Sequence, residues 1–325
     1  VMSYGDYPDD TYTGTSNGDY HKKCIVRSNG VVENFALGVD KATFIPLEGK
    51  DFMDPQYLSE EVDHSWFTYP DGTKTLHPID GVTDPKFTGP KSGTKEKWEY
   101  LDEDKKYSWI KSPTFKGKTA EVGPLAKYIV VYTKVKQGII KEPTWAEAMI
   151  VRQIDTVSQV LGVPAHVWMT TMVGRTACRG LDAQVAANIS QYFFNKLVSN
   201  IKNGDTAVAD MAKFEPNTWE KDAKGVGLVD APRGGLGHWI HIKDGRSANY
   251  QCIVPSTWNA CPKTAANEHG AYEDAMIDTK VKIADKPLEI LKVIHSFDPC
   301  LACATHLYNK KGEKIVSVNT DALCK

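Results

Sequence analysis

The sequence predicts a helix-rich α+β fold, in which a bundle of long helices carries short antiparallel β hairpins at its periphery. Two stretches, 144–161 and 176–202, show the spacing of apolar residues that is typical of long amphipathic helices. An Asp-Gly pair at 244–245 lies between two extended segments, which is a strong hairpin signal. We expect residues 1–140 to form an irregular α+β region with short strands. Residues 141–325 then hold the helical bundle, the hairpin and a C-terminal metal-binding segment, within one continuous domain of a longer subunit.

The composition is that of an ordinary soluble protein. The 325 residues are 41% hydrophobic and 25% charged, which allows a sizeable core. A net charge of -2 gives no sign of a nucleic-acid-binding surface, so nucleic acid is not expected as a partner. The seven cysteines are scattered and odd in number, unlike a disulfide framework. Only Cys300 and Cys303 stand at a functional spacing, and the others are expected to be buried or free thiols.

The first long helix is predicted to begin at a capping box formed by Thr144 and Glu147 and to end at Gly162. The second runs from about Thr176 to Lys202. It carries an apolar residue at every fourth position, namely Leu181, Val185, Ile189, Phe193, Leu197 and Ile201. Such a stripe is most often a packing surface, so we expect it to be buried in the core.

A short strand and a short helix are also predicted. The apolar run 128–133 is expected to be a short strand. A last helix should begin near Pro287 and end by Ser296, because Pro299 disfavours helical backbone angles at Asp298. The residues that follow therefore leave this helix at a turn, which suits the presentation of thiolates.

The register of the predicted hairpin indicates which residues lie opposite each other at its open end. Strands at 236–243 and 247–254, joined by a two-residue turn, would place Arg233 opposite Ser256 if the ladder continued in register beyond its open end. A guanidinium and a hydroxyl would then stand side by side. A bulge in either strand would shift the register and spoil this arrangement.

Three residues near the C-terminus, Cys300, Cys303 and His306, offer two thiolates and an imidazole at regular spacing. Thiolates select zinc, copper(I), iron–sulfur or nickel–iron chemistry over hard cations. A zinc site needs about four ligands, and the sequence has no second Cys-x-x-Cys pair. A thioredoxin-like dithiol calls for a preceding strand, whereas a helix is predicted here. Metal binding is therefore favoured over a redox dithiol or no function.

Two further segments carry hydrogen-bond donors. Arg233 lies in a Pro-Arg-Gly-Gly turn, where a guanidinium can meet an anionic or hydrogen-bond-accepting ligand. The simpler interpretation is an ion pair with Asp230. Ser256 follows a strand end in Val-Pro-Ser-Thr-Trp, which by itself is an ordinary strand terminus. His238, taken alone, is more often a satisfied core histidine than a ligand.

These segments, in this order, resemble the large subunit of nickel–iron hydrogenases. The Asp-Pro-Cys-x-x-Cys-x-x-His motif at 298–306 is similar to that family's C-terminal signature. The similarity extends to further segments at 107–113, 121–126, 174–177, 230–234 and 254–258. It covers most of the chain from about residue 100, and the earlier part more loosely.

The resemblance implies a role for each matching residue. Cys300 would be a terminal thiolate on nickel, and Cys303 would bridge nickel and an iron that carries carbon monoxide and cyanide. Arg233 and Ser256 would donate hydrogen bonds to the cyanides, and Arg233 would also be a candidate base in hydrogen splitting. Asp298 would hold this arginine through a charge-assisted contact.

The resemblance also implies neighbours of this centre. Pro232 and Val254 would lie beside the cofactor. His306 would bind a magnesium ion, and the backbone carbonyl of Cys252 would be a second ligand of that ion. A maturation protease would cleave after His306 and remove the tail 307–325, so the sequence is expected to be an unprocessed precursor.

The implied activity is reversible heterolytic cleavage of H2 to protons and electrons, with the electrons passed to an iron–sulfur small subunit. A membrane cytochrome b is a further implied partner. The complex is expected on the periplasmic side of the membrane, exported with its small subunit, rather than in the cytoplasm.

One family motif, Arg-x-Cys-Gly-x-Cys, is absent from the sequence. We therefore expect a missing N-terminal part to supply the other thiolates, and this fragment alone to be inactive. The alternative is a non-catalytic module that binds zinc or iron through Cys300, Cys303 and His306. A relative of the respiratory complex I subunit is disfavoured, because that group has lost the cysteines.

Overall fold

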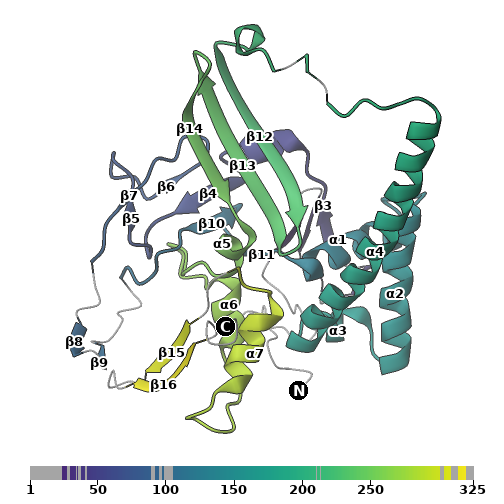
Figure 1. The fold of residues 1–325 in the computed structure, drawn as a ribbon. Coiled ribbons are helices and arrows are strands. Elements are labelled where there is room, and N and C mark those ends of the chain that lie inside the picture. The colour runs from purple at the N-terminus through teal and green to yellow at the C-terminus, as the bar shows by residue number, and fades with distance from the viewer. Residues whose placement is uncertain are drawn as a thin grey trace.

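The computed structural model describes residues 24–27, 30–33, 35, 38–40, 42–88, 92–94, 97–98, 105–209, 211–212, 214–300, 304–308 and 314–319. They form a mixed helix and sheet structure, in which long helices lie on one side and a three-stranded sheet extends from the centre, where one of its strands contacts the first long helix (Figure 1). Across these ranges, no helix has the length and apolar character required to span a membrane.

The long helices pack against one another around the first hydrophobic core. They are α1 (Pro124–Lys136), α2 (Trp145–Leu161) and α4 (Met172–Lys202), with the short α3 (Ala165–Trp168) between the last two. Side chains from these helices and from the nearby β2 are buried together, among them Val32, Ile129, Ile154, Met169 and Cys178.

The prediction that 128–133 forms a strand is wrong, because this run lies within α1. Tyr128, Ile129 and Val130 are all fully buried, and the rest of the run is nearly so. A helix that is buried on every side shows no amphipathic period, so its apolar run cannot be told from a buried strand by pattern alone.

The ends of the long helices follow local chemistry. The capping box is confirmed: Glu147 N donates to Thr144 Oγ1 (3.3 Å), and Thr144 N donates to the Glu147 carboxylate (2.9 Å). Gly162 ends α2 in the left-handed conformation, with a φ of 68°. The helix α4 begins four residues earlier than predicted, because Thr171 caps it by accepting from Gly174 N (3.1 Å).

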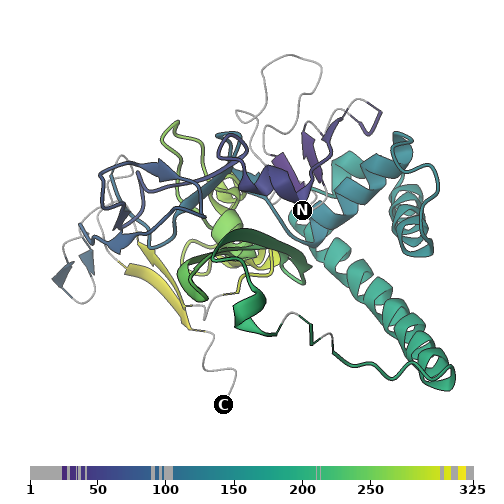
Figure 2. The ribbon, with the colours of Figure 1, turned by 90° about the horizontal axis from the view of Figure 1, so that it is seen from above.

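The apolar stripe of α4 is buried only in its first half. Val185 is 4% exposed, and Leu181 and Ile189 pack against the core. The prediction of burial is wrong for the last three members of the stripe, Phe193, Leu197 and Ile201, which are 55–57% exposed. Their part of α4 extends away from the remainder of the molecule (Figure 2).

Small sheets form most of the N-terminal region. A four-stranded sheet has the order β11-β1-β2-β3, with β1 (Cys24–Arg27) parallel to β11 (Ala120–Glu121) and antiparallel to β2 (Gly30–Glu33), which pairs with β3 (Thr43–Ile45). A second sheet has the order β10-β4-β6, formed by Ser112–Phe115, Leu58–Glu61 and Thr75–Leu76. Two-stranded pairs are β5 (Phe67–Thr68) with β7 (Asp84–Pro85), and β8 (Ser92–Thr94) with β9 (Lys97–Trp98). Two 3-10 helices are η3 (Gly49–Met53) and η4 (Pro216–Thr218).

The longest strands form the sheet β12 (Asp222–Ala231), β13 (Gly234–Lys243) and β14 (Arg246–Ile253). The predicted turn is confirmed, since Lys243 pairs with Arg246 and both turn residues have positive φ. A bulge at His241/Ile242 then shifts the register by one residue. β12 was not anticipated from the sequence. It pairs with β13 on the side opposite to β14.

The expected pairing of Arg233 with Ser256 across the ladder is therefore wrong. The bulge changes the register, and β14 ends at Ile253, before Ser256 is reached. Arg233 instead lies in the two-residue turn between β12 and β13, where Ala231 pairs with Gly234. Figure 1 shows this turn directed toward the centre of the molecule, near α5 and β11.

The C-terminal region adds three short helices and a hairpin. They are α5 (Pro255–Asn259), α6 (Ala271–Met276) and α7 (Leu288–Ser296), followed by β15 (Ala304–Tyr308) paired with β16 (Lys314–Asn319). The predicted last helix is confirmed as α7. It packs against α6 through a small core that includes Tyr272, Val293 and Phe297.

Candidate metal centre

The candidate site lies where three segments of the chain meet. They are the β12–β13 turn with Arg233, the first turn of α5 with Ser256, and the residues after α7. Cys300 N donates to Ser256 Oγ at 3.0 Å. Asp298 Oδ2 lies 3.7 Å from Arg233 Nε. Four residues predicted from three separate motifs therefore meet in two contacts, Cys300 with Ser256 and Asp298 with Arg233.

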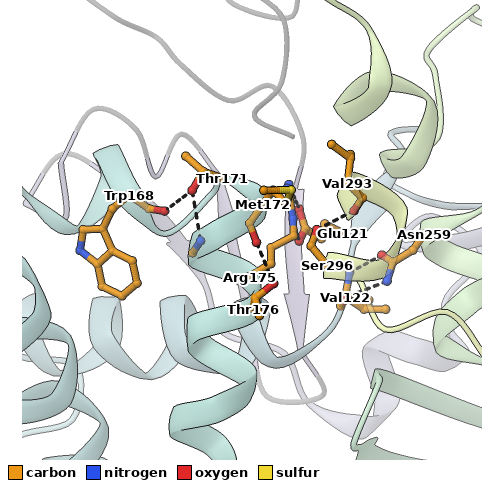
Figure 3. A network of polar contacts seen from close by, with 11 residues as sticks. Glu121, Val122, Trp168, Thr171, Met172, Arg175, Thr176, Asn259, Val293 and Ser296 are labelled. Carbon is orange, nitrogen blue, oxygen red and sulfur yellow. Dashed lines mark hydrogen bonds and ion pairs between the residues drawn. The ribbon is translucent and has the colours of Figure 1, made fainter. Parts of the chain in front are cut away.

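The turn that carries Arg233 is seated on the end of β11. Gly234 has a φ of 125°, and a Cβ at this position would lie 2.5 Å from Gly123 N. Only glycine allows this close approach of two backbones. Asn259 then holds the same strand end, because its side chain accepts from Val122 N (2.9 Å) and donates to Val122 O (2.8 Å), as Figure 3 shows.

The Nε–H group of Arg233 is a hydrogen-bond donor that could bind a ligand. Its Nε is buried and, among the described residues, has no hydrogen-bond partner. The nearest carboxylate oxygen, of Asp298 at 3.7 Å, forms an ion pair but is too distant for a hydrogen bond. The side chain as a whole is 42% exposed, so the guanidinium remains accessible. A buried donor left without a partner suits a ligand that accepts a hydrogen bond.

Asp298 is placed by the end of α7. Phe297 caps the helix, Asp298 N donates to His295 O (3.0 Å), and Asp298 itself has a φ of 56°. Aspartate tolerates this left-handed conformation better than most residues, and a helix commonly ends in it. The chain then turns away from α7, so that Cys300 is presented beside α5, where its side chain is exposed.

Ser256 is buried, with only 5% exposure. Its oxygen receives the N–H of Cys300, so the hydroxyl keeps its own hydrogen for donation to another group. Pro255 stands before it in the first turn of α5 and shapes the entry to the helix. Ser256 thus orders the cysteine segment and still offers a donor.

The remaining predicted residues surround this point. Pro232 is exposed in the β12–β13 turn, and Val254 is the N-cap of α5. Cys252 pairs with His238 across β13 and β14, and its thiol is exposed. Cys303 lies outside the described residues. His306 lies in β15, where only the backbone is described.

A buried ion pair links α4 to β11 and contacts the end of α7, next to the site. Arg175 in α4 makes two contacts with Glu121 in β11, from Nε to Oε1 (2.7 Å) and from Nη2 to Oε2 (3.0 Å). Both side chains are buried. The guanidinium also stacks on the ring of Phe297, with its Cζ 4.1 Å from the centroid. Figure 3 shows this pair between α4 and the end of α7.

Sequence reasoning missed the roles of Glu121, Arg175 and Arg179. Arg179 Nη1 lies 3.2 Å from Asp298 Oδ1, so this carboxylate faces two arginines. The available signal was the spacing of Arg175 and Arg179, which places both on one face of a helix. The predicted helix began at residue 176, which left Arg175 outside it.

The residues present fit a metal–diatomic centre in part. Cys300 has an exposed thiol, and Arg233 and Ser256 each have a donor that could reach an acceptor ligand carried by a metal. In the described part of the chain, no group of three or more His, Cys, Asp or Glu side chains could hold a metal ion.

Comparisons with known proteins agree on one family. A family model described as nickel-dependent hydrogenase matches residues 1–306. An uptake hydrogenase large subunit from Rhizobium leguminosarum bv. viciae is 43% identical over 320 residues, which are 98% of this chain and 50% of that protein. The hydrogenase-1 large chain of Escherichia coli (strain K12) is 41% identical over 98% of this chain and 49% of that protein. The chain thus spans about half the length of these curated relatives.

Solved structures show the same fold. A reduced, active form of the Ni-Fe-Se hydrogenase from Desulfomicrobium baculatum has a TM-score of 0.57 and 23% identity, covering 83% of this chain and 46% of that one. A [NiFeSe] hydrogenase variant from Desulfovibrio vulgaris Hildenborough has a TM-score of 0.54 and 25% identity, with the same coverage.

Proposed function

This chain belongs to the nickel-dependent hydrogenase family, and from that membership we propose that it is the C-terminal part of a catalytic large subunit that cleaves H2 reversibly into protons and electrons. The observation that carries the proposal is the meeting of Arg233, Ser256, Asp298 and Cys300 at one place, where the Arg233 Nε donor has no hydrogen-bond partner among the described residues. The relatives' names, uptake hydrogenase large subunit and hydrogenase-1 large chain, support the same activity.

The proposed cofactor is a nickel–iron centre whose iron carries carbon monoxide and cyanide. Cys300 and Cys303 would supply two of the thiolates that hold nickel and iron. When bound, the centre supplies the Lewis acidity and redox chemistry that H2 cleavage requires. Arg233 and Ser256 would donate hydrogen bonds to the cyanides, and Pro232 and Val254 would border them.

The protein's own contribution is to place donors and a proton acceptor. The released proton would be received at the Cys300 thiolate. Arg233, the candidate base, would receive it only in the neutral guanidine form, because a guanidinium has no free lone pair. Asp298 would hold this guanidinium in place from 3.7 Å. A magnesium ion would be bound by His306 together with the backbone carbonyl of Cys252.

Further ligands and partners follow from the same proposal. Since the chain spans about half of its relatives' length, the other half of the subunit would supply the Arg-x-Cys-Gly-x-Cys thiolates and complete one continuous domain with a larger helical bundle. An iron–sulfur small subunit would receive the electrons, and a membrane cytochrome b would accept them on the periplasmic side. A maturation protease would cleave after His306, where the family match also ends.

Metal analysis of the full-length gene product, produced with its small subunit, tests the proposal. We expect equal nickel and iron, with infrared bands in the cyanide and carbonyl region, and loss of both in Cys300→Ala. Zinc as the only metal would contradict the proposal and favour the non-catalytic module. A mature subunit whose mass still includes residues 307–325 would contradict the processing step.

A further inference from the structure

We propose that Arg179 in α4 is a positioning residue, which shares the carboxylate of Asp298 with Arg233 and so keeps Arg233 Nε available to the metal centre. The inference rests on the proposed function, because it assigns that donor to a ligand of the metals. Asp298 Oδ1 lies 3.2 Å from Arg179 Nη1, whereas Oδ2 lies 3.7 Å from Arg233 Nε. The two arginines therefore face different oxygens of one carboxylate.

The helix α4 holds Arg179 in this position. Arg175 stands one helical turn earlier on the same face, locked to Glu121 and stacked on Phe297. Arg179 Nη1 also donates to His295 O at 3.4 Å. Arg175 and Arg179 thus contact the end of α7 at three residues, His295, Phe297 and Asp298. Arg179 is tied to the backbone of that helix end as well as to the carboxylate.

The contact with Arg179 fixes the orientation of the Asp298 carboxylate. Its two oxygens move together, so the contact of Oδ1 with Arg179 restricts rotation about the Cβ–Cγ bond of Asp298, which is otherwise a broad torsion. At 3.7 Å, Oδ2 is beyond hydrogen-bond distance of Arg233 Nε.

Without Arg179 the carboxylate can turn toward Arg233. Arg233 Nε is buried and has no hydrogen-bond partner among the described residues, and the fold is stabilised when such a buried donor acquires an acceptor. Asp298 would then take the hydrogen bond that the proposed function assigns to a cyanide. Arg179 therefore acts on the metal centre through Asp298 and Arg233, without touching it.

The variants Arg179→Gln and Arg179→Lys, made in the full-length subunit and assembled with its partner, test this. In a crystal structure of Arg179→Gln, the distance from Asp298 Oδ2 to Arg233 Nε should shorten to about 2.9 Å, the usual length of such a hydrogen bond. The cyanide infrared bands should shift, with nickel and iron contents unchanged. We expect kcat to fall about tenfold, as for one misplaced hydrogen bond, and KM for H2 to stay constant. Arg179→Lys should recover part of both effects.

A second variant separates this positioning role from a general loss of structure. In an Asp298→Gly background no side-chain oxygen competes for Arg233 Nε, and glycine tolerates the φ of 56° at this position, so adding Arg179→Gln should shift the cyanide bands no further. Lys136→Gln is the matched control, because Lys136 has the same 39% side-chain exposure as Arg179 and pairs with Asp155 on α2 at 2.8 Å. It should leave the bands and kcat unchanged.

The outcomes distinguish the two proposals. Wild-type enzyme without nickel, iron or cyanide bands would overturn the proposed function. Wild-type enzyme with those bands, and an Arg179→Gln variant whose bands and Asp298–Arg233 distance match it, would overturn the role of Arg179 alone. An equal band shift in the Asp298→Gly background would likewise overturn it.

Discussion

Replacing Glu121 by Gln should destabilise the protein far more than the loss of a surface charge. Glu121 and Arg175 have side chains only 1% and 2% exposed, and their two contacts measure 2.7 and 3.0 Å. The change removes the negative charge that the buried Arg175 guanidinium contacts twice, at a cost of about 3–5 kcal/mol in the free energy of unfolding. Because Arg175 also stacks on Phe297, the change should loosen the end of α7.

Urea unfolding of the full-length subunit, followed by tryptophan fluorescence, measures this cost. The control is Lys136→Gln, which removes a pair whose side chains are 39% and 46% exposed and should cost less than about 1 kcal/mol. The double variant Glu121→Gln with Arg175→Met should cost less than the sum of the two single variants, because it leaves no unpaired charge. A Glu121→Gln cost no larger than that of the control would refute the reasoning.

Three further predictions concern the site and its surroundings. Gly234→Ala should lower Tm and displace the Arg233 turn, since its Cβ would lie 2.5 Å from Gly123 N at a φ of 125°; an unchanged Tm would argue against the close packing. Ser256→Ala should shift the cyanide bands, because the variant loses the hydroxyl that orders Cys300 N and offers a donor; bands at wild-type positions would assign the donor elsewhere. Burial raises the pKa of Glu273 above its ordinary value of 4.5, so the folded state binds this proton more tightly, and stability should decline as pH rises from 4.5 through the raised pKa. Glu273→Gln should flatten that decline in pH-dependent urea unfolding, and an unaltered pH profile would contradict the assignment.

Local signals in the sequence predicted local structure well. The Thr144–Glu147 capping box, the end of α2 at Gly162 and the Asp244-Gly245 turn each depend on residues within four positions of one another. The same is true of α7, whose end is set by Pro299. Such features form through hydrogen bonds and backbone preferences that a short peptide already contains.

Longer-range features escaped the same reasoning. The run 128–133 looks extended because its burial on all sides hides the helical period. The bulge at His241/Ile242 has no sequence signal of its own, yet it alters every pairing beyond it. The exposure of Phe193 and Leu197 depends on which surfaces lie beside α4, and a stripe of apolar residues does not reveal that.

The sequence by itself determined which residues could carry the chemistry, because thiolates, a guanidinium and a hydroxyl in motif order already resemble the hydrogenase signature. Only the tertiary structure decided how they meet. Arg233 reaches Asp298 through the β12–β13 turn seated on Gly123, rather than along the β13–β14 ladder. Arg179 lies at the site only because α4 packs against α7. Contacts between segments distant in the sequence depend on packing and register, which no local pattern encodes.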